Sequence, residues 1–213
     1  MPLAELQPYL WVFPAQGLPE IGDATNNQEP IHWQSLFGNE QPVEIEIGFG
    51  KGAFLVSAAA LHPAINFFGI EISRKHQLFT ATRLVKRKLA NVRLVCADAR
   101  DLFRHWIPPA SVQAIHVYFP DPWWKKRHHK RRVFTPDFVA SCCNALRRGG
   151  RLLVATDVPE SLAMITDLCS QEARLRLAPH STSADDLEYV TNFERKAVKQ
   201  GRPVARAVYQ RFT

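Results

Sequence analysis

A short segment of the chain places one acidic side chain beside a dense group of basic ones. Asp121 lies between Pro120 and Pro122, and six Lys or Arg residues and two His residues occupy the eight positions 125–132. Proline fixes its own φ and disfavours helix in the residue before it, so we expect Asp121 to lie on a stiff, extended turn. A carboxylate held in this way can stabilise positive charge that grows in a reacting group, and the basic residues can bind a polyanion.

The excess positive charge of the chain falls in this same segment. The sequence contains 27 Lys and Arg residues against 20 Asp and Glu residues, and 21 against 20 remain when the six basic residues of positions 125–132 are set aside. A nearly neutral body with one cationic segment indicates where a nucleic acid would bind. The alternative is a solvated surface, the usual role of a run of charges. We favour nucleic acid, because Trp123, Trp124 and the preceding strand tie the segment to a predicted crevice.

The elements that must position these residues follow from hydrophobic periodicity. Strands are predicted at 43–47, 66–70, 92–96, 112–118, 151–156, 175–177 and 204–212, and helices at 53–61, from Ser73 to about 88, around 102–106, at 136–146 and at 159–169. Gly149 and Gly150 are expected to end the fourth of these helices. The alternation predicts an α/β fold, a Rossmann-like doubly wound, mostly parallel seven-stranded sheet with helices on both faces. Residues 1–40 are expected to form an irregular N-terminal arm, and residues 41–213 a single domain.

Acidic residues follow five successive predicted strands. They are Glu46, Glu71, Asp98, Asp121 and Asp157. In an open α/β sheet the ligand binds beyond the carboxyl ends of the strands, so we expect these acids to surround one crevice. Asp98 and Asp157 have an alternative role as helix caps. The same alternative applies to residues 191–194, whose sequence Thr-Asn-Phe-Glu matches a capping box.

A glycine-rich turn joins the first predicted strand to the first helix. Gly48, Gly50 and Gly52 lie in this turn, and Glu71 follows Gly52 by 19 residues, the spacing at which an acid binds ribose hydroxyls. The turn indicates a nucleotide-type cofactor, although glycine also favours tight turns without any ligand. It also matches a loose dinucleotide pattern, so the turn alone leaves an NAD-linked oxidoreductase open.

The cysteines and the apolar segments of the sequence indicate the cellular compartment and the absence of a metal site. Cys96, Cys142, Cys143 and Cys169 form no C-x-x-C pair and have no zinc-finger spacing to His, so buried thiols and no metal site are expected. Residues 1–10 do not resemble a signal peptide, and no apolar run is long enough to cross a bilayer. We therefore expect a cytoplasmic protein without membrane contact.

At these residues the chain resembles the tRNA (guanine-N7)-methyltransferase family of the bacterial TrmB type. The matching segments, in order, are 46–52, 69–71, 119–123, 125–132, 156–157 and 191–194 with Gly201 behind them. The glycine turn is common to class I methyltransferases, whereas the proline-flanked Asp121 followed by the basic segment is much more specific. The resemblance implies methyl transfer from S-adenosylmethionine to N7 of a guanine in the tRNA variable loop, expected at position 46 of the tRNA. It also implies tRNA as the partner of a monomer or homodimer.

The resemblance implies roles for the site residues. Cofactor binding is expected from Glu46, Gly48, Gly50, Gly52, Glu71, Asp98 and Asp121, and Asp121 is the catalytic candidate. Substrate binding is expected from Lys125, Asp157, Thr191, Asn192, Phe193 and Glu194. Contact with the tRNA backbone is expected from Lys126, Arg127, Lys130, Arg131 and Arg132. Two alternatives stay open, the oxidoreductase and a noncatalytic RNA-binding module that keeps a cofactor fold as a scaffold.

Overall fold

The fold is that of a computed structural model, which describes residues 1–12, 29–122, 127, 132–178 and 199–213. The N-terminal elements are α1 (Leu3–Leu6), η1 (Gln7–Tyr9) and α2 (Trp33–Phe37). The alternating part of the chain contains β1 (Val43–Ile47), α3 (Ala53–Leu61), β2 (Asn66–Glu71), α4 (Arg74–Arg87), β3 (Val92–Cys96), α5 (Ala99–His105) and β4 (Val112–Tyr118). It continues with α6 (Pro136–Ala145), β5 (Leu146–Thr156), α7 (Pro159–Ser170), β6 (Leu175–Leu177) and β7 (Ala205–Arg211).

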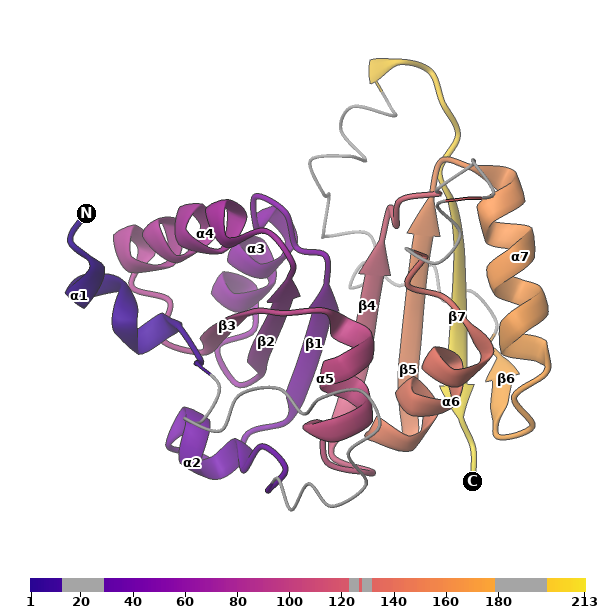
Figure 1. The fold of residues 1–213 in the computed structure, drawn as a ribbon, viewed down its shortest axis with the longest axis horizontal. Coiled ribbons are helices and arrows are strands. Elements are labelled where there is room, and N and C mark those ends of the chain that lie inside the picture. The colour runs from indigo at the N-terminus through magenta and orange to yellow at the C-terminus, as the bar shows by residue number, and fades with distance from the viewer. Residues whose placement is uncertain (13–28, 123–126, 128–131, 179–198) are drawn as a thin grey trace.

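The strands in the described residues form a seven-stranded sheet in the order β3-β2-β1-β4-β5-β7-β6 (Figure 1). Strands β1 to β5 run parallel, and β7 runs antiparallel to both of its neighbours. This confirms the predicted doubly wound, mostly parallel sheet. The strand order reverses between β1 and β4, so a ligand crevice is expected beyond the carboxyl ends of these two strands.

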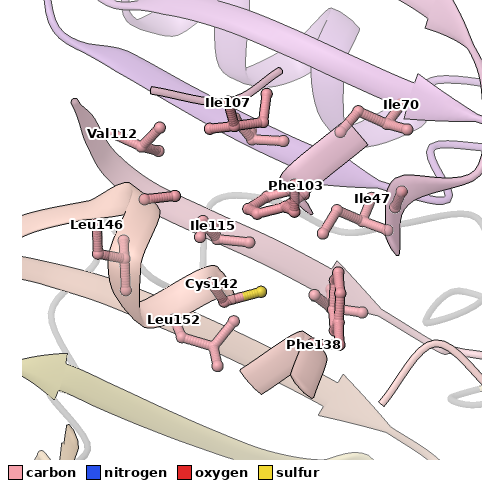
Figure 2. Close-up of a cluster of buried hydrophobic side chains, with 14 of the residues drawn as sticks. Ile47, Ile70, Phe103, Ile107, Val112, Ile115, Phe138, Cys142, Leu146 and Leu152 are labelled. Atoms are coloured by element: carbon pink, nitrogen blue, oxygen red, sulfur yellow. The ribbon is translucent and has the colours of Figure 1, made fainter. Parts of the chain in front are cut away.

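Helices cover both faces of the sheet because side chains alternate along each strand. Phe68 packs into a core with residues of α5, α6 and α7, whereas its neighbour Phe67 packs into a second core with α3 and α4. Figure 2 shows part of the first core, where Ile115 of β4 lies among Phe103 of α5 and Cys142 of α6. The two cores hold the sheet rigid, and the loops at its carboxyl edge are therefore fixed at their strand ends.

The described parts of the N-terminal segment contain three short helices, α1, η1 and α2, and residues 13–28 of the predicted irregular arm lie outside the described residues. Leu10 forms a parallel bridge with Leu94 of β3, and the Trp11 N–H donates to the Leu94 carbonyl at 2.9 Å. These contacts cover the edge of β3, which would otherwise expose unpaired main-chain groups.

The boundary between α6 and β5 corrects one prediction. Gly149 and Gly150 do not end the helix, because α6 already ends at Ala145 and both glycines lie inside β5. The register shifts here, since Leu146 pairs with Val112 but Arg151 pairs with Ala114. Gly149 has φ +79°, and a Cβ on Gly150 would lie 2.8 Å from the Arg147 carbonyl oxygen. The glycines therefore permit a bulge at the start of the strand.

The four cysteines are free thiols, as predicted. Cys142, Cys143 and Cys169 are buried, while Cys96 at the end of β3 is half-buried. Burial raises the pKa of Cys169 to about 12, so this thiol stays protonated at neutral pH. Within the described ranges, none of the helices has the length and apolar character needed to cross a membrane.

Candidate active site

The glycine turn between β1 and α3 forms one side of the site. Gly48, Gly50 and Gly52 all have positive φ, between +51° and +74°. At Gly52 a side chain is excluded twice, by this φ and by the Thr80 side chain of α4, which a Cβ would strike. At Gly48 and Gly50 a Cβ would meet no atom within 4 Å, so the backbone of the turn is open there. Gly52 is the N-cap of α3 and provides no side-chain cap.

Glu71, at the end of β2, holds the glycine turn in place. Its Oε2 accepts a hydrogen bond from the Gly50 N–H at 2.9 Å, and its Oε1 accepts one from the Ser73 N–H at 2.9 Å. The residue as a whole is 8% exposed. Each oxygen keeps a further lone pair, so Glu71 can order the turn and still accept from a ligand hydroxyl.

Glu46 lies on β1, next to the turn, and its carboxyl group is buried. The residue is 4% exposed, and its Oε2 has no hydrogen-bond partner among the described residues. Burial and the neighbouring Glu71 raise the pKa of Glu46 to about 8, against a main-chain hydrogen bond from Leu55 that favours the charged form. A buried acceptor without a partner is costly, and it is well suited to a ligand that brings a donor or a positive charge.

Asp98 acts within the protein as the cap of α5. Its Oδ1 accepts from the Arg100 N–H at 2.9 Å, and its Oδ2 lies 2.6 Å from Nη2 of the Arg100 guanidinium. Burial opposes ionisation of Asp98, but the hydrogen bonds from Arg100 outweigh it and lower the pKa of the carboxyl. The sequence left a cap and a cofactor contact open for Asp98, and the structure contains the cap.

The turn after β4 carries Asp121 at the crevice. Phe119 adopts φ +53°, which is uncommon for a residue with a side chain, and its N–H donates to the Ala155 carbonyl at 2.7 Å. Asp121 is exposed, which is compatible with the predicted role in contacting a substrate. The turn is held on its far side by Arg132, whose Nε donates to the Pro122 carbonyl at 3.1 Å.

The basic segment falls largely outside the described residues. Lys125, Lys126, Lys130 and Arg131 lie there, together with the predicted substrate residues Thr191, Asn192, Phe193 and Glu194. Arg127 is exposed. Arg132 is half-buried, and in addition to Pro122 it contacts Sδ of Met164 in α7 at 3.3 Å. Its guanidinium therefore anchors the Asp121 turn to α7.

Asp157 follows β5 and forms an ion pair with Arg202. Arg202 also donates to Gln200 at 2.7 Å, so the residues before β7 are fixed against the end of β5. No local sequence pattern predicts this pair, because 45 positions separate the two residues. Asp157 thus lies at the same edge of the sheet as Glu46 and Asp121, with its carboxylate already oriented.

A buried polar chain beneath the site was not anticipated from sequence. Glu44 Oε2 lies 2.9 Å from His116 Nε2, and His116 Nδ1 lies 2.9 Å from the Tyr118 hydroxyl. Gln113 donates to the second oxygen of Glu44 at 2.9 Å. Burial raises the pKa of Glu44, but the contacts with His116 and Gln113 outweigh it and the net pKa is lowered. This series of hydrogen bonds ends at Tyr118, the residue before the Phe119 turn. Its one signal in the sequence was a pair of acidic residues in the apolar strand 43–47.

Solved structures of other proteins share the fold of this chain. Solved structures with the same fold include the 16S rRNA methyltransferase KamB, at 17% identity and TM-score 0.62, covering 87% of this chain and 96% of that one. TrmN from Thermus thermophilus matches at 20% identity and TM-score 0.56, covering 84% of this chain and 47% of that one. At these identities the likeness establishes the class I methyltransferase fold.

Sequence relatives are considerably closer. A family model described as "Putative methyltransferase" matches residues 40–207. A tRNA (guanine-N(7)-)-methyltransferase of Rhodopirellula baltica is 43% identical over 190 residues, which cover 85% of this chain and 70% of the relative. One of Alkalilimnicola ehrlichii is 36% identical over 206 residues, which cover 95% of this chain and 84% of the relative. With this identity along nearly its whole length, the chain belongs to the tRNA (guanine-N(7)-)-methyltransferase family.

Proposed function

We propose that the protein transfers the methyl group of S-adenosylmethionine to N7 of a guanine in the variable loop of tRNA. The observation that carries this proposal is that Glu46, a buried carboxyl whose Oε2 has no partner among the described residues, adjoins a glycine turn held by Glu71 at the sheet edge that also carries Asp121. The names of the relatives support tRNA and guanine N7 as substrate and target atom. Membership of a methyltransferase family supports the donor.

The residues present fit the cofactor. Glu46 Oε2 would accept from its ammonium group or a hydroxyl, Glu71 from its ribose hydroxyls, and the open backbone at Gly48 to Gly52 would lie against it. When bound, the cofactor supplies an electrophilic methyl group on a sulfonium sulfur. Asp98 would border the pocket from α5, where its hydrogen bonds with Arg100 keep its carboxylate ionised and fixed.

Methylation at guanine N7 does not require proton transfer. N7 carries a lone pair in the ring plane and no proton, so no general base is needed, and alignment of N7 with the methyl group dominates. Positive charge grows on the purine as the methyl group moves. Asp121 can accept guanine N–H groups and oppose that charge with its own, which is an interaction that strengthens in the transition state.

The substrate side of the crevice divides into two tasks. The guanine would be contacted by Asp157, which Arg202 orients, by Lys125 and by residues 191–194. The basic segment 125–132 would hold the phosphate backbone, so that one base reaches Asp121. Arg132 has a further part here, since it ties the turn that carries Asp121 to α7. The proposed substrate places the enzyme in the cytoplasm, and we expect a monomer or homodimer without an obligatory protein partner.

The direct test is incubation with labelled S-adenosylmethionine and unmodified tRNA, followed by mapping of the labelled base. The expected product is N7-methylguanine in the variable loop. Label in another base, or another position of guanine, would contradict the proposed target. Absence of any label would contradict the proposed activity and favour the alternative of a noncatalytic RNA-binding module.

A further inference from the structure

Helix α4 is a second cationic element of the chain. Together with Lys88, which caps it, α4 carries six Lys and Arg residues and no acidic residue. Setting these six aside as well as the six of positions 125–132 leaves 15 Lys and Arg residues against 20 Asp and Glu residues. The positive charge is therefore not confined to positions 125–132, contrary to the prediction from sequence. The chain instead has an acidic body with two cationic elements.

The outward face of α4 is formed by Lys75, Phe79 and Lys86, which we call the α4 stripe. At 100° per residue these three positions fall within about 40° of one another around the helix axis. The buried residues Gln77, Thr80, Ala81 and Leu84 occupy the opposite side. All three stripe residues are exposed, and Phe79 is 49% exposed despite its apolar ring. An aromatic ring between cations is typical of surfaces that bind nucleic acid.

Helix α4 explains one of the two cations of the α4 stripe: Lys86 lies in the last turn, where the helix dipole favours positive charge, whereas nothing in the helix explains Lys75. No ion pair joins Lys75 or Lys86 to any residue in the described part of the chain. Lys75 and Arg74 lie in the first turn, where the helix dipole disfavours positive charge, and no acid is present in that turn to offset it. Helix stability would favour acidic residues at these positions. Lys75 is therefore better explained by a polyanionic partner.

Helix α4 lies on the other side of the strand-order reversal from β4, and the end of α4 that carries Lys75 is the one at the carboxyl edge of the sheet. Helix α4 begins just after Glu71 and contacts β2 and β3, on one side of the point where strand order reverses. The basic segment follows β4, on the other side of that point. Figure 1 shows α4 and the end of β4 on either side of the end of β1. A substrate that reaches the crevice between them would meet positive charge on both sides.

We propose that the α4 stripe is a second RNA-binding surface, at which Lys75 and Lys86 contact the phosphodiester backbone of the RNA substrate away from the reacting guanine. This inference rests on the proposed function, since it assumes an RNA substrate in the crevice. The two lysines are 11 positions apart, a rise of about 16 Å along the helix. Contacts so far apart would span several nucleotides and would orient the RNA relative to the crevice.

The test compares two double charge-reversal variants of equal net charge. The first is Lys75→Glu with Lys86→Glu, and the control is Arg104→Glu with Arg148→Glu, at exposed positions on α5 and β5 away from the crevice. For each variant and the wild type, the affinity for unmodified tRNA is measured as a function of salt concentration, and the affinity for S-adenosylhomocysteine by calorimetry. Guanine methylation by the wild type is measured in parallel.

Loss of two phosphate contacts lowers the log–log salt slope by about 1.4 to 1.8. We expect this decrease for the stripe variant, with unchanged S-adenosylhomocysteine affinity, and a slope close to that of the wild type for the control. Equal slopes in the two variants would overturn the inference, as would a stripe variant that loses S-adenosylhomocysteine binding in parallel. Failure of the wild type to methylate guanine would instead contradict the proposed function, so the two failures are distinguishable.

Discussion

Glu46 and Glu71 place two buried carboxyl groups at the ends of neighbouring parallel strands, and the two are held very differently. Both oxygens of Glu71 accept main-chain hydrogen bonds, whereas Oε2 of Glu46 has no partner among the described residues. Burial and the charge of Glu71 raise the pKa of Glu46 to about 8. At neutral pH the free enzyme therefore holds Glu46 mostly protonated beside an ordered carboxylate.

This arrangement predicts that Glu46→Gln changes the pH dependence of stability. The folded pKa of Glu46 lies above its ordinary value of 4.5, so between pH 4.5 and about 8 the native state binds more protons than the unfolded state. Stability conferred by the protonated form is present below that window and is lost as pH rises through it, with a slope of up to about 1.4 kcal/mol per pH unit. Denaturant unfolding from pH 5 to 9 should show this loss in the wild type and a smaller loss in the variant. Parallel pH profiles for the two proteins would disprove the assignment.

Glu71→Gln should weaken cofactor binding without unfolding the protein. An amide presents one acceptor oxygen in place of two, so either Gly50 or Ser73 loses its partner and the glycine turn loosens. Loss of a hydrogen bond to a charged group costs about 1.5–3 kcal/mol, which corresponds to roughly 10- to 150-fold in affinity. Calorimetric titration with S-adenosylhomocysteine measures the affinity for the cofactor product. The matched control is Glu160→Gln, at an exposed position of α7. Equal affinities for the two variants would show that the turn does not depend on Glu71.

Asp121→Asn should slow methyl transfer and leave tRNA binding nearly intact. The amide keeps the shape of the side chain but cannot oppose the positive charge that grows on the guanine. Removal of one such stabilising group costs about 10²- to 10³-fold in kcat. Single-turnover assays at saturating tRNA isolate this step, and the tRNA affinity measured alongside tests the protein's integrity. Unchanged turnover would rule out an electrostatic role for Asp121.

Glu44→Ala should destabilise the fold more than any exposed substitution on the same side of the molecule. It leaves His116 and Gln113 without their buried partner, and breaking a buried pair in this way costs about 3 kcal/mol. Glu40→Ala, at an exposed position, should change the free energy of unfolding by no more than about 0.5 kcal/mol. Urea unfolding of both variants at pH 7 measures the difference. If Glu44→Ala lowers the free energy of unfolding as little as Glu40→Ala does, the hydrogen bonds that link Glu44, His116 and Tyr118 contribute little to stability.

Much of the fold was predictable because it depends on short-range features. Alternating apolar runs and a helix cap such as Ser73 specify strands and helices from their immediate neighbours, and the mostly parallel sheet follows from the order of those elements. The prediction failed at Gly149 and Gly150. There the same two residues suit either a helix end or a bulge, and pairing with β4 selects the bulge.

The sequence predicted where the candidate site residues lie in the fold, and their roles stay predictions. The glycine turn and the proline-flanked Asp121 are local signals, and the sheet places them at one edge. Lys125 and residues 191–194 lie outside the described residues, so their roles remain predictions. For Asp98 the structure contains the predicted helix cap, through the Arg100 N–H, and cofactor binding by Asp98 stays a prediction.

Sequence alone determined the order of the elements, the turn chemistry, and the acids and cations available to the crevice. Tertiary structure decided which of them meet. Glu44 and His116 are 72 positions apart, and Asp157 and Arg202 are 45 apart, so these pairs exist because the strand order brings β1 beside β4 and β7 beside β5. The raised pKa of Glu46 has the same origin. Burial and the approach of a second carboxyl are properties of the packed sheet, and no local pattern encodes them.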